Sequence, residues 1–462
     1  MPGGRPVWSM PGMSKKFRPW NVQQDFLLPP SLLDWLPEHH LARFVLEVVE
    51  ELDLGPIYEP YEKELRGYPP YEPKMMVALL LYAYCTGVTS SRKIERKTQE
   101  DVAFRVLAAN QSPDHSRISA FRRRHGVHFE NLFVQLLKLC ARAGLVKLGH
   151  VALDGTKLKA NASKHKAMSY ERMRKEEEKL RGRVKELLAQ AEAVDAEEDA
   201  RYGKGKRGDE LPEELRRAQT RLERIRQARQ ALEAEARAAA EASKGKDDDD
   251  DAPPPAQDLP SHTVPHTAEG KPTPKAQRNF TDADSRLMKR GTSFEQAYNA
   301  QAAVDSAHQV IVAQALTNQP PDAEHLPALV DRVAAHLEEV PRKLSADAGY
   351  FSAKNVGWLE SVGVEPYIAT GRQKHGESPP KVRGRPPAGL TPKERMARKL
   401  ATTRGKEVYR MRKAIAEPVF GQIKEARGIR TLLRRGLKAA REEWALICAT
   451  HNLLKLFHAS AA

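Results

Sequence analysis

The sequence predicts a multidomain protein of mixed α+β and α/β class, on three observations. At 462 residues, the chain is long enough for two or three domains with a substantial apolar core. Residues from about 30 to 145 carry apolar side chains at helical spacing, whereas strand and helix patterns alternate from residue 146 onward. Charged, alanine-rich and proline-rich sequence interrupts these patterns over residues 169–275. We therefore expect an all-helical N-terminal domain and a sheet-containing core with a large insertion.

Residues 1–145 are predicted to form the helical domain, with DNA binding as its proposed role. A buried helix is expected near residues 74–86, because Pro73 suits the first turn of a helix. A later helix is expected to open with Ser112 as its N-cap and Pro113 at its first position. The basic residues of this region are Arg92, Lys93, Arg96, Lys97, Arg117, Arg122, Arg123 and Arg124. Two interpretations stay open: a helix-turn-helix-like reader with its last helix in the major groove, or a packing or dimerisation domain with a solvated basic face.

Residues 146–243 combine a strand with an inserted arm. The segment 146–168 contains GHVALDGTKL, a short strand pattern ending at Asp154 and Gly155. Residues 169–243 hold two long helical patterns separated by glycines and Pro212, which predicts an antiparallel helical hairpin, a coiled-coil arm. Interaction or dimerisation is the favoured role of this arm, with DNA contact second. Residues 244–275 combine five aspartates with many prolines and predict a disordered linker, not a metal site.

The strand order of the remaining core indicates its fold. Over residues 276–370, two strand patterns flank Asp305 as a hairpin and are followed by helix, strand, helix and strand. Preceded by the strand before Asp154, this order is that of a ribonuclease H-like core. Residues 371–405 predict a mobile basic loop, in which Arg383 and Arg385 resemble an AT-hook core; specific minor-groove binding and nonspecific phosphate attraction are the alternatives. Residues 406–462 predict a catalytic helix and a C-terminal helix, whose His451 and Asn452 we interpret as structural.

Three acidic residues in this order are candidates for catalysis. Asp154 and Asp347 each follow a short apolar run, and Glu417 lies in a basic helical segment. Two or three carboxylates converging from different elements can hold two Mg²⁺ ions, which activate an oxygen nucleophile and stabilise the leaving oxygen of a phosphodiester. Each acid taken alone has a plainer interpretation as a turn residue or surface ion-pair partner. Pro418 complicates Glu417, because a helix is expected to start or kink there.

Composition favours a nucleic acid partner and argues against a zinc-stabilised protein and a membrane protein. The formal net charge of +15 favours a polyanion, because Lys and Arg that contact phosphates release counterions. The three cysteines lie far apart with no CxxC pair, which predicts reduced thiols in a cytoplasmic protein without structural zinc. We expect no membrane segment, because no stretch approaches about 18 apolar residues.

Several blocks together resemble bacterial insertion-sequence transposases of the DDE class. The blocks are VALDGTKLKANAS, NAQAAVD, NQPPDAEHL, ADAGY and YxxRxxxxEPVFGQIK, together with YEPKMMVALLLYAYCTG, SSRKIE and PDHSRISAFRRRH in the N-terminal region. The resemblance covers most of residues 20–457. It implies that Asp154, Asp347 and Glu417 are the triad that binds two Mg²⁺ ions, for which Mn²⁺ can substitute. Tyr409, Arg412, Glu417 and Lys424 match the family's Tyr, Arg, Glu, Lys signature, although Lys413 has the commoner three-residue gap to the glutamate.

The resemblance also implies a reaction and partners. Transposon ends would be hydrolysed to expose 3′-hydroxyls, which then attack target DNA. The partner is double-stranded DNA, both terminal inverted repeats and target, bound by at least a homodimer, and the protein would be nucleoid-associated when bound. The expected DNA contacts are Tyr409, Arg412, Lys413, Lys424, Lys157, Lys159, Arg383, Arg385, Arg122, Arg123 and Arg124. A catalytically inactive DNA-binding derivative and a metal-dependent nuclease without strand transfer are the alternatives.

Overall fold

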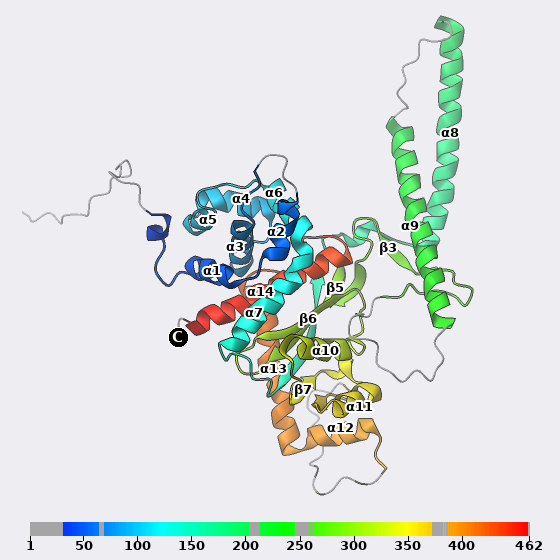
Figure 1. Cartoon of the computed structure of the whole chain (residues 1–462). Helices are drawn as coiled ribbons and strands as arrows, with labels where there is room; N and C mark the ends of the chain where they lie inside the picture. The colour runs from blue at the N-terminus through cyan, green and yellow to red at the C-terminus, as the bar shows by residue number, and fades with distance from the viewer. Residues whose placement is uncertain are drawn as a thin grey trace, which may run out of the picture.

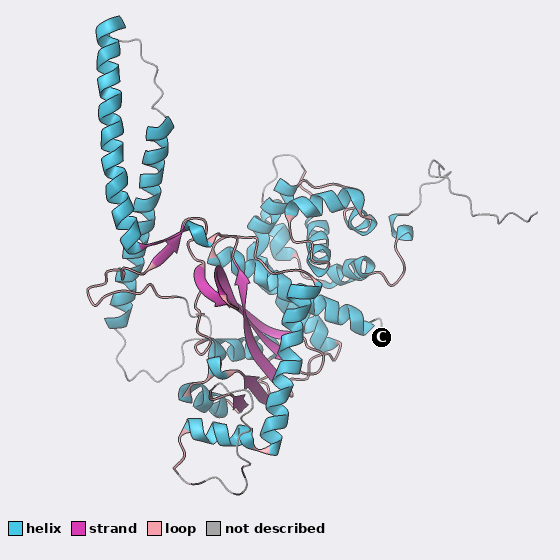
Figure 2. Ribbon diagram, turned by 180° about the vertical axis from the view of Figure 1, so that it is seen from behind, coloured by secondary structure: helices cyan, strands magenta, loops and turns pink. Residues whose placement is uncertain are grey.

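The computed structural model describes residues 31–63, 69–202, 213–244, 259, 262–371, 382, 384, 387 and 389–460. A helical N-terminal region, a central sheet with its helices, and a long two-helix arm make up the molecule (Figure 1). Figure 2 shows the strands at the centre with helices around them and the arm projecting to one side. No helix within the described ranges is both long and apolar enough to span a bilayer.

The N-terminal region is helical, as predicted. Its helices are α1 (Leu41–Glu51), α2 (Gly55–Glu62), α3 (Pro73–Cys85), α4 (Ser91–Glu100), α5 (Val102–Leu107), α6 (His115–His125) and α7 (Phe129–Arg142), with 3₁₀ turns at Leu32–Trp35 and Gly126–His128. Almost every side chain of α3 is buried, which confirms the central helix expected after Pro73. Helix α6 starts later than expected, because Asp114 caps it by accepting from the backbone N–H groups of Ser116 and Arg117.

The central sheet contains the predicted strands in the predicted order, and it has a further strand at Arg286–Arg290 that was not predicted from the sequence. Its strands are β1 (Val151–Lys159), β4 (Arg286–Arg290), β5 (Ser293–Asp305), β6 (Ile311–Thr317), β7 (Lys343–Ala346) and β8 (Glu365–Ile368). The order across the sheet is β6, β5, β1, β7, β8, and β4 pairs with the other half of β5. β1 is antiparallel to β5 and parallel to β7, which in turn is parallel to β8. Three antiparallel strands followed by two parallel additions are consistent with a ribonuclease H-like core.

Helices cover this sheet and tie it to the N-terminal region. They are α10 (His325–Leu337), α11 (Ala353–Ser361), α12 (Pro392–Ala401), α13 (Thr403–Gly421) and α14 (Leu437–Ser460), with a 3₁₀ turn at Ala348–Tyr350 and a π-helical turn at Gln422–Ala426. α13 contacts β1, β5, β7 and β8, whereas α14 contacts β6, α3 and α7. The side chain of Asn452 exchanges two hydrogen bonds with the backbone of Ile311, and His451 bonds the Gln309 carbonyl. Both residues are therefore structural, as predicted.

The arm consists of two helices that run side by side in opposite directions. α8 (Tyr170–Tyr202) and α9 (Glu213–Lys244) are joined by ion pairs from Arg221 to Glu176 and from Arg183 to Glu214. Glu177 is almost fully buried between the helices and accepts from three arginines, Arg181, Arg226 and Arg229. At the arm's base, β2 (Ala167–Ser169) pairs with β3 (Gln277–Asn279), after a 3₁₀ turn at Lys164–Lys166. The turn expected at Pro212 lies outside the described residues.

Four local features differ from the sequence expectations. β1 does not end at Asp154 but pairs with β5 as far as Lys159. Residues 262–275, expected in a disordered linker, fold against the arm, with a bridge between His266 and Pro272. α12 lies within the expected mobile loop, because Thr391 and Glu394 form a reciprocal capping box. α13 runs without a break through Pro418 instead of starting there.

Candidate active site

The first two candidate carboxylates lie level with each other on neighbouring strands. Val151 and Ala152 of β1 pair with Leu344 and Ser345 of β7 in parallel register. Continuing that register places Asp154 beside Asp347, which follows the last residue of β7. The side chain of Asp154 accepts from the Gly155 N–H at 2.9 Å, and that of Asp347 accepts from the Gly349 N–H at 2.8 Å. The sheet therefore brings together two residues that stand 193 positions apart in the sequence.

Glu417 approaches from the helix that packs across these strands. It lies exposed on α13, which contacts both β1 and β7. Pro418 is accommodated inside this helix, and its carbonyl accepts from the backbone N–H of Gln422, where the π-helical turn begins. A π-helical turn next to a functional residue is a common way to adjust the direction of the following side chains. Lys424 lies within this turn, whereas Tyr409, Arg412 and Glu417 lie on α13 before it.

The electrostatic environment of Asp154 reflects all three acids. The pKa of Asp154 is raised to about 6, chiefly by burial and to a smaller extent by the negative charges of Asp347 and Glu417. The Arg412 guanidinium and the Gly155 N–H oppose this rise in pKa, because both favour the ionised carboxylate. Nη1 of Arg412 lies 3.6 Å from Oδ2 of Asp154, and both side chains are largely buried. Asp154 is thus a largely buried carboxylate with one close guanidinium counterion, and Asp347 and the exposed Glu417 lie near enough to influence its charge.

The donor chemistry of this region fits a hard divalent cation, since carboxylate oxygens are the ligands that Mg²⁺ and Mn²⁺ accept. Within the part of the chain that the structure describes, however, no three His, Cys, Asp or Glu side chains converge closely enough to hold a metal ion. Asp154 is instead turned to Arg412 and the Gly155 amide, and Asp347 to the Gly349 amide. The carboxylates are in electrostatic reach of one another without being arranged as a coordination shell.

The cations of the expected signature occupy distinct positions. Arg412 is buried, with its guanidinium 5.7 Å from the ring centroid of Tyr409. Lys413 is exposed on the same helix, so the structure places Arg412, not Lys413, next to Asp154. The ammonium group of Lys424 hydrogen-bonds the Thr156 hydroxyl of β1, and burial lowers the pKa of Lys424 to about 8. These contacts link the signature helix to the strand that carries Asp154.

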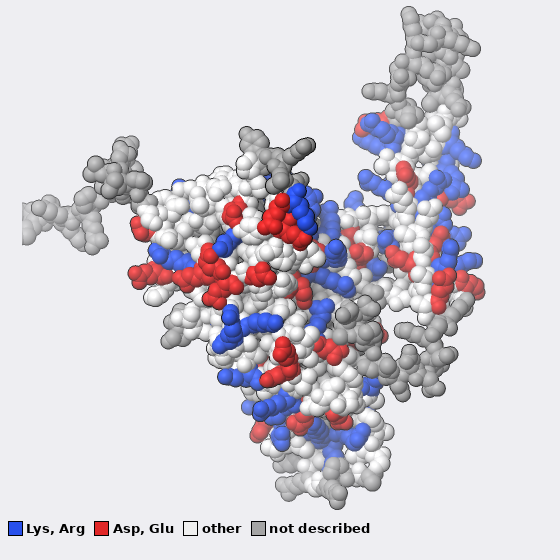
Figure 3. All heavy atoms as spheres, in the orientation of Figure 1, with Lys and Arg blue, Asp and Glu red and all other residues white. Residues whose placement is uncertain are grey.

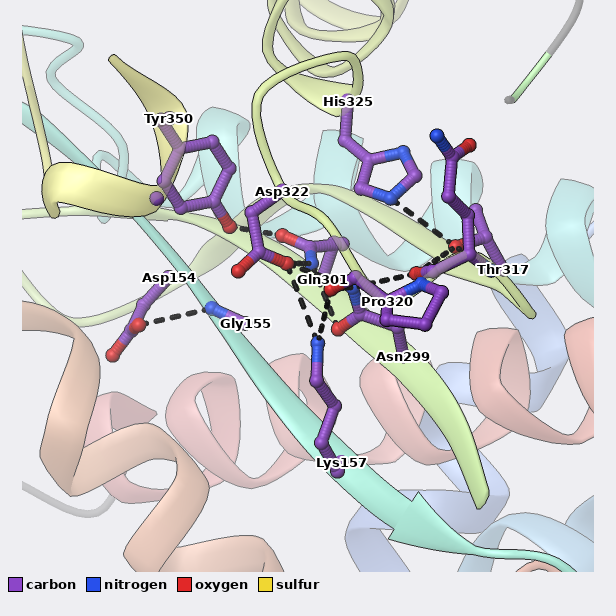
Figure 4. Close-up of polar contacts among 12 residues, drawn as sticks. Asp154, Gly155, Lys157, Asn299, Gln301, Thr317, Pro320, Asp322, His325 and Tyr350 are labelled. Carbon is purple, nitrogen blue, oxygen red and sulfur yellow. Dashed lines mark hydrogen bonds and ion pairs between the residues drawn. The ribbon is translucent and has the colours of Figure 1, made fainter. Parts of the chain in front are cut away.

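A carboxylate that the sequence reasoning did not select lies beside Asp347. A Cβ atom at Gly349 would lie 3.0 Å from Oδ1 of Asp347 and 3.2 Å from Oδ2 of Asp322. Oδ1 of Asp322 accepts from Nδ2 of Asn299 and from Nε2 of Gln301, both at 2.7 Å (Figure 4). The only signal in the sequence was its place in the NQPPDAEHL block, which contains no strand or helix pattern that singles it out.

Asp322 belongs to a network that supports the loop carrying Asp347. Gln301, which donates to Asp322, accepts from the Tyr350 hydroxyl, and Tyr350 is fully buried three residues after Asp347. Lys157 donates to the Pro320 carbonyl at 3.0 Å and lies 3.5 Å from Asp322 (Figure 4). The expected DNA contact at Lys157 is therefore directed into this network, with most of its side chain covered. Gly155 approaches Gln301 so closely that a Cβ atom there would lie 2.5 Å from Nε2.

The remaining expected DNA contacts are scattered. Arg122 is buried and donates to the Tyr84 hydroxyl and the Thr89 carbonyl, so its guanidinium is directed into the N-terminal region. Arg123 is exposed, and Arg124 stacks on Tyr61 with its guanidinium 4.7 Å from the ring centroid. Lys159 lies half-buried at the end of β1. Arg383 and Arg385 lie outside the described residues.

Two comparisons with protein families agree with this geometry. A family model described as "Transposase domain (DUF772)" matches residues 30–124, the region of α1 to α6. A second, described as "Transposase DDE domain", matches residues 261–453, which include Asp347 and Glu417. Searches of the curated proteins and of the solved structures gave no significant match.

The mixed sheet and its carboxylates define the class of the molecule as an α+β protein with a DDE transposase domain. The chain belongs to the DDE transposases of insertion sequences.

Proposed function

We propose that the chain cleaves the ends of a mobile DNA element and joins the exposed 3′-hydroxyls to target DNA. The observation that carries this proposal is the electrostatic convergence of three acids from three elements: the pKa of Asp154 is raised by burial and by the charges of Asp347 and Glu417. Neighbouring carboxylates repel one another, and divalent cations relieve that repulsion. The double-stranded DNA partner is supported by the transposase families and by the net charge of +15.

The proposed metal ligands are Asp154, Asp347 and Glu417, with two Mg²⁺ ions or Mn²⁺ in their place. Bound divalent ions supply the activation of the attacking oxygen and the stabilisation of the leaving oxygen. Arg412 holds Asp154 in position from the helix side, and Tyr409 packs beside this guanidinium. Lys413, exposed on α13, and Lys424, in the turn after it, are the proposed contacts to DNA phosphates. Reaction at two ends held together requires at least a homodimer on DNA, located with the nucleoid.

The test uses a linear DNA that carries the inverted repeats flanking the gene, labelled at its 5′ ends, with a supercoiled plasmid as target. With Mg²⁺ or Mn²⁺, we expect cut ends and joined products, and none with EDTA. Asp154→Asn, Asp347→Asn and Glu417→Gln, each made singly, should lower the cleavage rate by about 10³-fold, which corresponds to about 4 kcal/mol in the barrier. Glu425→Gln is the matched control, because Glu425 is exposed and its ion pair among the described residues is with Arg430.

The outcomes separate the three functions. Cut ends without joined products would establish a nuclease. Retained DNA binding with neither product, in the wild-type protein under all metal conditions, would establish a non-catalytic derivative. Full activity in any one of the three acidic variants would remove that residue from the triad.

A further inference from the structure

A continuous groove runs along the junction of the arm and the sheet. Three adjoining cavities of about 450, 710 and 650 Å³ share His165 as a lining residue, and neighbouring pairs of them share Lys164, Lys166 and Arg172. The walls come from the end of β1 and the segment after it, the first turn of α8, the middle of α9 and the β4–β5 turn. We call this the arm-base groove.

The arm-base groove is strongly basic. Its cations are Lys159, Lys164, Lys166, Arg172, Arg221, Arg224 and Arg435, whereas its one carboxylate, Glu295, pairs with Arg290 at 3.1 Å. Of these cations, only Arg221 has a carboxylate partner within the described residues, Glu176 at 2.8 Å. Lys and Arg side chains are prominent on the arm in the space-filling view (Figure 3).

Several other cations of the arm are paired with carboxylates. Arg181, Arg226 and Arg229 all converge on Glu177, and Lys175 pairs with Glu171 at 2.7 Å. Like charges that lie close together repel, which lowers the stability of the folded protein. A polyanion that enters the groove removes this repulsion and releases its own condensed counterions.

The groove continues the strand that carries the candidate active site. Lys159, in the groove wall, lies five residues after Asp154 on β1. Five residues of extended strand span about 17 Å, the length of about five base pairs at 3.4 Å each. A duplex that follows β1 from Asp154 therefore reaches the groove about half a helical turn away. Phe294 and Phe280, 52% and 37% exposed, line the same groove and offer apolar surface beside the cations.

We propose that the arm-base groove binds the phosphate backbone of duplex DNA. The arm is then a DNA-holding element, with the groove cations contacting phosphates on the DNA that follows β1. That this DNA also enters the carboxylate site rests on the proposed function, whereas binding in the groove does not.

The test measures DNA binding alone, without divalent metal. A fluorescein-labelled 30-base-pair duplex of mixed sequence is titrated with the full-length protein, and anisotropy is recorded from 50 to 300 mM NaCl. The groove variant is Lys164→Gln, Lys166→Gln and Arg172→Gln combined. The matched control is Arg174→Gln, Lys179→Gln and Lys185→Gln, which removes the same charge from exposed arm positions outside the groove.

The groove variant is expected to bind about 10- to 100-fold more weakly at 100 mM NaCl, and the slope of log K against log salt to fall by about 2 to 3. The control variant should stay within about threefold of the wild type. Equal weakening of both variants, or no weakening in the groove variant, would overturn the proposal. A change in molecular mass by light scattering with unchanged DNA binding would do so too, and would assign the groove to a second copy of the chain. Single Lys166→Glu serves if the triple variant does not fold. Because no cleavage is measured, failure of the proposed catalysis leaves this result intact.

Discussion

Nη1 of Arg412 lies 3.6 Å from Oδ2 of Asp154, with 10% and 17% of these side chains exposed. Among the charges that most affect the pKa of Asp154, Arg412 is the cation, while Asp347 and Glu417 add negative charge. A guanidinium therefore offsets part of the negative charge that would attract a divalent ion. It also fixes the rotation of α13 relative to β1, because the salt bridge joins these two elements.

Replacing Arg412 by Gln should strengthen metal binding while it weakens catalysis. The positive charge opposes a divalent cation, so its loss should lower the dissociation constant for Ca²⁺ by about three- to tenfold, or up to about 1.4 kcal/mol. Isothermal titration with Ca²⁺ measures this directly. Arg410→Gln, at an exposed position on the same helix, should leave the constant unchanged. Weaker Ca²⁺ binding in Arg412→Gln would show that the guanidinium organises the ligands instead of opposing the ion.

Asp322 is predicted to position the loop that carries Asp347. The Asp322 carboxylate accepts hydrogen bonds from Asn299 and Gln301. In Asp322→Asn, the amide oxygen can still accept, but it carries no full negative charge, and the new NH₂ group adds two donors. We expect a loss of about 1 to 3 kcal/mol in unfolding free energy, and a larger effect on the rate than on DNA affinity. Urea unfolding and the cleavage assay give the two numbers. Asp331→Asn on α10 is the control; a loss confined to stability would make Asp322 a structural residue only.

Arg122 and Arg123 should separate stability from DNA contact. The Arg122 guanidinium donates to Tyr84, whose hydroxyl donates to the buried Glu443 of α14. Without this guanidinium, the buried Glu443 carboxylate loses a nearby positive charge. Arg122→Ala should therefore lower the unfolding free energy by about 3 kcal/mol. Arg123→Ala, next in the sequence and exposed, should change it by less than about 0.5 kcal/mol. Equal effects of the two substitutions on urea unfolding would refute this distinction.

His451 should contribute to loss of stability in acid. Burial first, then the charges of Arg427 and Lys455, lower the pKa of His451 to about 3, against the pull of its bond to the Gln309 carbonyl. Below the ordinary value of about 6.5, the unfolded chain takes up a proton that the folded chain excludes. The contribution of His451 to the unfolding free energy is thus fully present above pH 6.5 and is lost as the pH falls toward 3. Between pH 7 and 5, the loss is about 2 kcal/mol.

The measurement compares the slope of unfolding free energy against pH in wild type and His451→Gln. The variant should show a shallower slope, whatever its absolute stability. His458→Gln, at an exposed position on the same helix, should keep the wild-type slope. An unchanged slope in His451→Gln would assign the acid sensitivity to other buried histidines.

The sequence by itself determined most of the main elements and their order, but not β4 or α12. Periodicity located α3, the two arm helices and the hairpin around Asp305, because these patterns are local and their faces are either buried or solvated along their whole length. Strand order and residue types also selected Asp154 and Asp347, whereas the choice of Glu417 rested more on the family resemblance. The continuation of β1 to Lys159 was not predictable in this way, since it depends on pairing with β5, and the same holds for helix α13 passing Pro418.

Tertiary structure alone decided which polar groups meet. Arg122 and Arg123 are adjacent in one basic run, yet packing against Tyr84 buries the first and leaves the second in solvent. Asp322 is held next to Asp347 by hydrogen bonds from Asn299 and Gln301, which lie on β5, 23 and 21 residues earlier in the sequence. The sequence shows the groove cations only as part of the positive net charge. They come together in space because β2 pairs with β3 at the base of the arm. The physical reason is that burial and charge pairing depend on distances between elements, which a linear pattern does not contain.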